Sequence, residues 1–126
     1  MLQKLRQRAS EALATARQIV LSSYGPADIQ AEVLPCEALG LALYVLVPRT
    51  ADLLFNLENN ALVVATADTW QARGVARLLP PGGHPDRLAL ARTPAAAWCE
   101  VVEIRPTRLH LRALNGQGQG ETIDLW

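Results

Sequence analysis

The sequence predicts a small antiparallel β-barrel with helical additions, in a mainly β (α+β) domain. Three features predict it: about seven short apolar or alternating segments, short connections between them, and two segments with helical spacing of apolar residues. The chain has 126 residues, which is the size of one domain, so residues 1–126 are treated as a single domain. Half of the residues are hydrophobic and 19% are charged, as in globular rather than disordered chains.

An amphipathic helix is expected first, over residues 2–17. Its apolar or small residues recur at steps of three and four positions: Leu2, Leu5, Ala9, Ala12, Leu13 and Ala16. Two strands follow, over residues 19–23 and 29–34, and the turn residues Gly25 and Pro26 lie between them.

A buried strand and a short helix form the middle of the predicted fold. Residues 41–47 are almost continuously apolar and end at Pro48, as in a strand that is buried on both faces. Thr50 is placed to cap a helix over residues 51–59, and Asp52 lies in its first turn. One apolar stripe of this helix consists of Leu53, Leu54 and Leu57.

The remaining elements read as strands, loops and one short helix. They are a hairpin of strands 62–67 and 72–79, a Pro/Gly loop over 80–85, a short helix over 94–97 capped by Thr93, two strands over 98–105 and 108–114, and a flexible tail over 115–126. In the last strand Leu109 and Leu111 alternate with Arg108, His110 and Arg112, so one face should point inward and the other should be polar.

Charge and hydropathy exclude several classes of function. Twelve basic residues balance twelve acidic ones, so nonspecific nucleic-acid binding is disfavoured. No apolar run is long enough to span a bilayer, and the first eight residues lack the apolar block of a signal peptide, so a cytoplasmic protein without a membrane partner is expected.

Chemistry-bearing residues are few, and none forms a recognisable catalytic set. Cys36 and Cys99 lack metal-ligand or redox spacing and are interpreted as buried thiols, while His84 and His110 are interpreted as surface residues. Three tryptophans, Trp70, Trp98 and Trp126, are expected in the core or an interface. The residues alone therefore predict a fold, no metal site and no reaction.

One stretch resembles a known family. Residues 43–60, with Asn56-Leu57 on the helix, and the strand that starts at 62–64 are similar to the strand, Asn-Leu helix and strand of pyridoxamine 5'-phosphate oxidase-like proteins. Residues 71–78 and 101–114 resemble two later strands of that family. The resemblance implies a split β-barrel of six or seven strands that works as a homodimer with FMN at the subunit interface, where the flavin supplies the chemistry.

The resemblance also implies a site and contains a departure. Gln71 and Arg73 match positions near the flavin in that family, and Arg49 and Thr50 lie just upstream of the helix, where they could replace the usual phosphate contact; the four together would hold the phosphate and ring edges. FMN-binding members commonly place lysine, and haem-binding relatives histidine, where this chain has Leu53, preceded by Asp52. Neither residue attracts a phosphate.

Two hypotheses follow. The chain is an FMN-binding split barrel and, if an enzyme, an oxidoreductase of unknown substrate, or it is a cofactor-free binding or regulatory module. Haem chemistry is a weaker variant, because neither histidine falls at the helix position. Pyridoxamine 5'-phosphate oxidase activity itself is not expected, because residues 122–126 do not match the Arg-Leu-Ser-type substrate segment.

Overall fold

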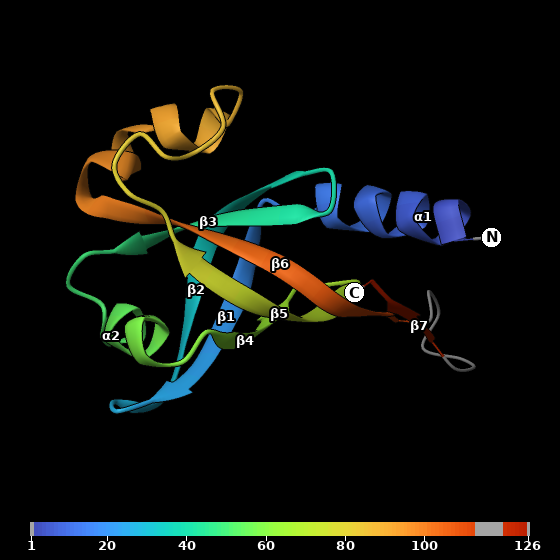
Figure 1. Cartoon of the computed structure of the whole chain (residues 1–126), viewed down its shortest axis with the longest axis horizontal. Coiled ribbons are helices and arrows are strands. Elements are labelled where there is room, and N and C mark those ends of the chain that lie inside the picture. Colours follow the sequence, from blue (N-terminus) through green and yellow to red (C-terminus); the bar gives the residue numbers. More distant parts are fainter. Residues whose placement is uncertain (1, 113–119, 126) are drawn as a thin grey trace.

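The computed structural model describes residues 2–112 and 120–125. Within them, seven antiparallel strands lie in the order β3-β2-β1-β4-β5-β6-β7, and β3 also pairs with β6. This last pairing closes β1 to β6 into a six-stranded barrel, and β7 extends it beyond β6 (Figure 1). The predicted antiparallel barrel with helical additions is confirmed.

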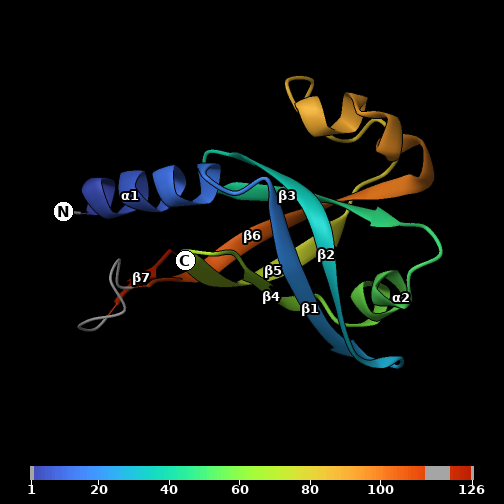
Figure 2. The ribbon, with the colours of Figure 1, turned by 180° about the vertical axis from the view of Figure 1, so that it is seen from behind.

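The elements have the following bounds. The strands are β1 (Gln18–Gly25), β2 (Asp28–Leu39), β3 (Ala42–Pro48), β4 (Leu62–Thr66), β5 (Trp70–Leu78), β6 (Cys99–Leu111) and β7 (Glu121–Asp124). The helices are α1 (Leu2–Ala14) and α2 (Asp52–Asn59), and two 3₁₀ segments are η1 (Ala89–Arg92) and η2 (Pro94–Trp98). Figure 2 shows α1 and α2 at opposite ends of the barrel, with η1 and η2 over a third side.

The core fills the barrel and extends under the 3₁₀ segments. Inward positions of the strands are almost fully buried, and Ala9 and Leu13 of α1 join them at one end. On β3 the other face is covered too, because Tyr44 and Leu46 pack against Leu88 and Leu90. This second layer explains why residues 41–47 are continuously apolar, as expected for a strand buried on both faces.

Several boundaries differ from the prediction. Residues 98–105 and 108–114 were expected as two strands, but β6 runs unbroken through Pro106, which lies opposite Gly74 where the register shifts. Proline has no N–H to donate to a neighbouring strand, and a bulge tolerates this because the hydrogen-bond ladder is interrupted there. Ala51, not Thr50, precedes α2, and no side-chain hydrogen bond caps that helix.

The ends of the chain also differ. The N-terminal helix ends at Ala14 rather than at residue 17. A flexible tail was expected over 115–126, yet Glu121–Asp124 pair with β6 because Ile123 and Leu125 are buried in the core. The rest of the expected tail, which is residues 115–119 with most of the glycine-rich stretch and Trp126, lies outside the described residues. Among the helices of residues 2–112 and 120–125, none has the length and apolarity to cross a membrane.

Candidate functional site

The four residues predicted to bind a cofactor lie in two separate places. Arg49 and Thr50 follow β3, whose last residue pairs with Cys99 at the start of β6. Gln71 and Arg73 pair with His110 and Arg108 near the end of β6. Arg108 lies nine positions after Cys99 on β6, which is roughly 30 Å along a strand. A single protomer therefore does not bring the two pairs together.

Arg49 is engaged in holding the fold. Its Nη1 donates to the carbonyl oxygen of Ala97 at 2.7 Å, and its Nε donates to Glu100 Oε1 at 3.3 Å. The guanidinium thus joins η2 to β6 and has a carboxylate beside it. A ligand phosphate at this place would have to displace Glu100.

The start of α2 does not offer a phosphate site. Leu53, at the position where the resemblance implies lysine for FMN binding, is 0% exposed and is part of the core. Asp52 is exposed in the first turn and adds negative charge there. The helix end is therefore built for packing.

Asn56 has a structural role that the sequence did not reveal. It is 0% exposed, and its Oδ1 accepts from the Ala27 N–H at 2.9 Å. Its Nδ2 donates to Asp28 O at 2.8 Å and to Ser23 Oγ at 3.1 Å. The Asn-Leu signature of α2 thus fastens this helix to the β1–β2 hairpin.

One side of the sheet faces outward without cover from any described element. We call it the outer face. Its side chains form two rows that cross the six strands β2, β1, β4, β5, β6 and β7, with one residue from each strand. The rows are Val33-Val20-Thr66-Gln71-His110-Thr122 and Ala31-Ser22-Val64-Arg73-Arg108-Asp124. On β2, β1 and β4 the outer face is largely apolar, and it exposes 73% of Ile29, 66% of Leu62, 63% of Val33 and 59% of Tyr24. On β5, β6 and β7 the two rows are polar and include Arg73 and Arg108, and Arg105 lies on the same face through its pairing with Val75. The outer face is therefore amphipathic across the sheet.

An apolar cavity of about 380 Å³ lies on the outer face. Its walls include Tyr24, Ile29, Leu62 and Val64, and Arg73 stands at its edge. Gly74 also lines the cavity, and on the opposite side of β5 a Cβ at this position would lie 2.9 Å from Arg105 O and 2.9 Å from Ile104 Cγ2, so the strands approach closely here. The cavity has the size and composition of a small-molecule site.

A polar cavity of about 240 Å³ adjoins it and shares Arg73. The other lining residues are Gln71, Arg108, His110 and Thr122. His110 Nδ1 lies 3.0 Å from Thr122 Oγ1, and Arg108 Nε donates to Asp124 Oδ1 at 2.8 Å, which raises the pKa of Arg108. Sequence alternation had placed Arg108 and His110 on a polar face, but their position beside Gln71 and Arg73 depends on strand pairing.

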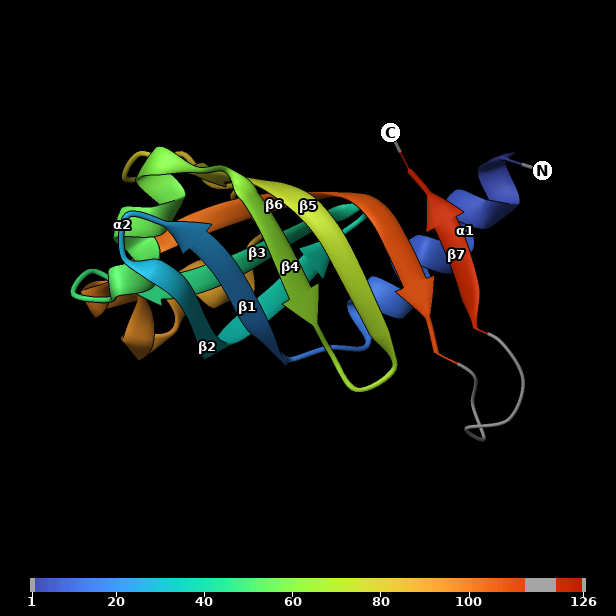
Figure 3. The same cartoon turned by 90° about the horizontal axis from the view of Figure 1, so that it is seen from below.

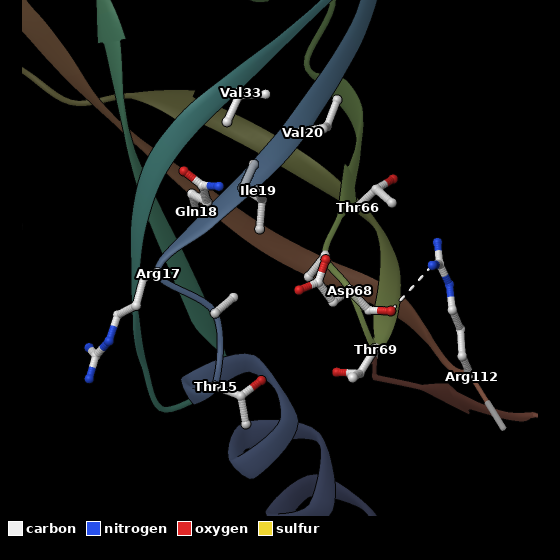
Figure 4. A pocket seen from close by; sticks show the side chains of 12 residues that line it. Thr15, Arg17, Gln18, Ile19, Val20, Val33, Thr66, Asp68, Thr69 and Arg112 are labelled. Atoms are coloured by element: carbon white, nitrogen blue, oxygen red, sulfur yellow. Dashed lines mark hydrogen bonds between the residues drawn. The ribbon is translucent and has the colours of Figure 1, made fainter. Parts of the chain in front are cut away.

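A third cavity, of about 670 Å³, lies where α1 meets the barrel (Figure 4). Arg112 reaches across from the end of β6 and donates to the Asp68 carbonyl oxygen at 3.3 Å, while Arg17 points away from the centre. Val20, Val33 and Thr66 line this cavity and belong to the outer face as well. The third cavity therefore continues from the outer face toward α1.

The remaining candidate residues lack reactive surroundings. Burial raises the pKa of the Cys36 thiol to about 11, and burial also raises the pKa of the half-buried Cys99, so neither forms a reactive thiolate near neutral pH. His84 is half-buried, with Nδ1 3.0 Å from Pro85 O. Trp70 lies in the core as expected, whereas Trp98 is 73% exposed.

Comparison with known proteins supports the fold. The sequence matches no known family profile and no curated protein. Among solved structures, a candidate pyridoxamine 5'-phosphate oxidase of Listeria innocua aligns with a TM-score of 0.63 and 16% identity, over 85% of this chain and 97% of that one. General stress protein 26 of Bacillus anthracis aligns with a TM-score of 0.64 and 16% identity, over 96% and 98%. A haem-binding protein of Mycobacterium smegmatis aligns with a TM-score of 0.67 and 17% identity, over 94% of this chain and 56% of that one.

These alignments show that the chain has the split-barrel fold of the pyridoxamine 5'-phosphate oxidase-like proteins, as the resemblance implied. At such low identity they show the fold alone. The function of such a fold depends on the residues of its own surface and cavities.

Proposed function

We propose that the protein binds FMN on the outer face and works as a homodimer that covers this face. The observation that carries the proposal is the apolar cavity with Arg73 at its edge. A flavin has a planar, largely apolar ring system and an anionic phosphate at the end of its ribityl chain. The outer face offers matching surfaces side by side.

The apolar half suits the ring system. Tyr24, Ile29, Leu62 and Val64 form the wall, and Ser22 and Thr107 supply hydroxyl groups beside it. Burying such a wall under a planar ligand is favourable because apolar area leaves water.

The cationic half suits the phosphate. Arg73 makes no side-chain hydrogen bond or ion pair within residues 2–112 and 120–125, so its guanidinium is available to an anion. Gln71 and Arg108 line the same polar cavity. Arg49 and Thr50 contribute only if a second protomer brings them to the site, and Arg49 must then leave Glu100.

The exposed apolar residues support the dimer. Four large side chains of one face, Tyr24, Ile29, Val33 and Leu62, lie in water in the single chain. A two-fold pairing of this face with itself would bury them and enclose a ligand bound between the copies. In such a site FMN would supply electron or hydride transfer, so an oxidoreductase is the enzyme class that we propose, with its substrate undetermined.

Visible absorbance of the purified protein and an FMN titration followed by flavin fluorescence test this proposal. We expect saturable quenching that weakens about tenfold or more in Arg73→Gln, because a charge-assisted hydrogen bond contributes about 1.5–3 kcal/mol. Arg77→Gln is the matched control, since Arg77 lies on the same strand but pairs with Glu103 away from both cavities. Equal affinity of the two variants would remove Arg73 from the site.

A cofactor-free binding module is the second candidate function. It is favoured by α2, where Leu53 is core and Asp52 is acidic. A colourless protein that ignores FMN throughout the titration would support this candidate, and a Soret band would instead indicate haem.

A further inference from the structure

Two arginines face each other across β5 and β6 on the outer face. Arg73 pairs directly with Arg108, and Asp124 follows Arg108 in the same row on β7. Figure 3 shows β5, β6 and β7 side by side in this order. Like charges directly opposite on neighbouring strands are destabilising. A bound anion would therefore reduce the repulsion between Arg73 and Arg108.

Asp124 relieves only part of this repulsion. Its Oδ1 accepts from Arg108 Nε at 2.8 Å, while both side chains remain largely exposed. A guanidinium has five N–H donors, so the two Nη groups of Arg108 remain available to a second acceptor. Arg73, which no carboxylate of the described residues contacts, lines the polar cavity together with Arg108, whereas Asp124 does not line it.

We propose that Asp124 determines which anions the polar cavity accepts: its carboxylate, held on Arg108, disfavours a dianionic group and tolerates a monoanionic or neutral one. The inference rests on the proposed function, because the FMN phosphate is the group that would enter this cavity. It adds a specificity-determining residue on β7, a strand that sequence reasoning had assigned to the flexible tail.

The size of the effect follows from Coulomb's law. Arg108 and Asp124 are both largely exposed, so the surroundings are close to bulk water, and a separation of roughly 6 Å is assumed between the ligand anion and the Asp124 carboxylate. Each unit of negative charge on the ligand is then disfavoured roughly threefold. A phosphate monoester is close to a dianion at pH 8, so its affinity is lowered roughly tenfold.

The test compares Asp124→Asn with wild type and with Glu121→Gln. Glu121 is the matched control because it lies on the same strand and is also ion-paired, but its partner is Arg8 of α1 at 2.7 Å. The probes are FMN and riboflavin, which share the ring and differ by the phosphate. We expect Asp124→Asn to bind FMN roughly tenfold more tightly at low salt, and riboflavin within twofold of wild type. Glu121→Gln should match wild type for both probes.

Unchanged or weaker FMN binding by Asp124→Asn would overturn the inference and leave the proposed function in place. If no variant binds either flavin, the proposed function fails and inorganic phosphate becomes the probe. The Nε–H signal of Arg108 is then followed by NMR during a phosphate titration. Saturation at a clearly lower phosphate concentration in Asp124→Asn supports the inference, and the same concentration in both proteins, or no response in either, overturns it.

Discussion

Replacing Asn56 with alanine should destabilise the fold more than any exposed substitution on the same helix. The change removes three hydrogen bonds, to the Ala27 N–H, the Asp28 carbonyl and Ser23 Oγ. Ser23 keeps a contact with Gln30 O at 3.4 Å, but the two backbone groups lose their partner. At about 1 kcal/mol for each lost bond, the free energy of unfolding should fall by about 3 kcal/mol.

Urea denaturation followed by circular dichroism measures this loss. Asn59→Ala is the matched control, because Asn59 is exposed on the same helix and its side chain donates to Phe55 O within that helix. We expect the control to lose less than about 1 kcal/mol. Equal losses in the two variants would refute the claim that Asn56 fastens α2 to the β1–β2 hairpin.

Gly25 provides a second, independent check on the same contact. A Cβ at this position would lie 2.7 Å from Asn56 Oδ1 and 3.1 Å from Asn56 Cα. Gly25→Ala should therefore be destabilising alone, and less so when Asn56 is already alanine, since the amide is then absent. A coupling of about 1 kcal/mol is expected from the double-mutant cycle. Strict additivity would show that the two residues do not compete for this space.

Three further predictions concern the core, the bulge and the dimer. The folded pKa of Cys36, raised to about 11 from 9.0, implies stability that is complete below pH 9 and is lost as pH rises toward 11. The free energy of unfolding, measured by urea denaturation, should fall by about 2 kcal/mol over this pH range in wild type and should stay level in Cys36→Ala; the same slope in both proteins would contradict this. Gly74→Ala should lower the free energy of unfolding by about 1–3 kcal/mol, because its Cβ would press on Arg105 O. A urea midpoint equal to that of wild type would argue against this close approach. Ile29→Asp should shift a dimer toward monomer in sedimentation, whereas Leu2→Asp, an exposed control on α1, should not; two unshifted profiles would place the dimer contact elsewhere.

Periodicity predicted the strands because inward positions alternate with outward ones along the barrel. It failed at β6, where Pro106 looks like a break in the sequence but occupies a bulge opposite Gly74. It failed again at β7, whose four residues are too short for a pattern and depend on β6 for pairing. Both errors come from contacts between distant parts of the chain.

The candidate site could be predicted only in part for the same reason. Gln71 and Arg73 came from a resemblance, and the structure places them beside a cavity. Arg49 was predicted as a substitute for the phosphate contact missing from the helix, but its pairing with Glu100 joins residues 51 positions apart. Arg108 and His110 were visible as a polar face, yet nothing local shows which strand lies opposite them.

The most direct test of the proposed function is to locate where FMN binds on the protein. Amide chemical shifts of the ¹⁵N-labelled protein, recorded during an FMN titration, report the location without assuming any reaction. We predict saturable shifts that concentrate at Leu62, Val64, Gln71, Arg73 and Gly74, on the outer face. Shifts confined to residues 49–53, or no saturable shift at all, would contradict the proposal that this face is the cofactor site.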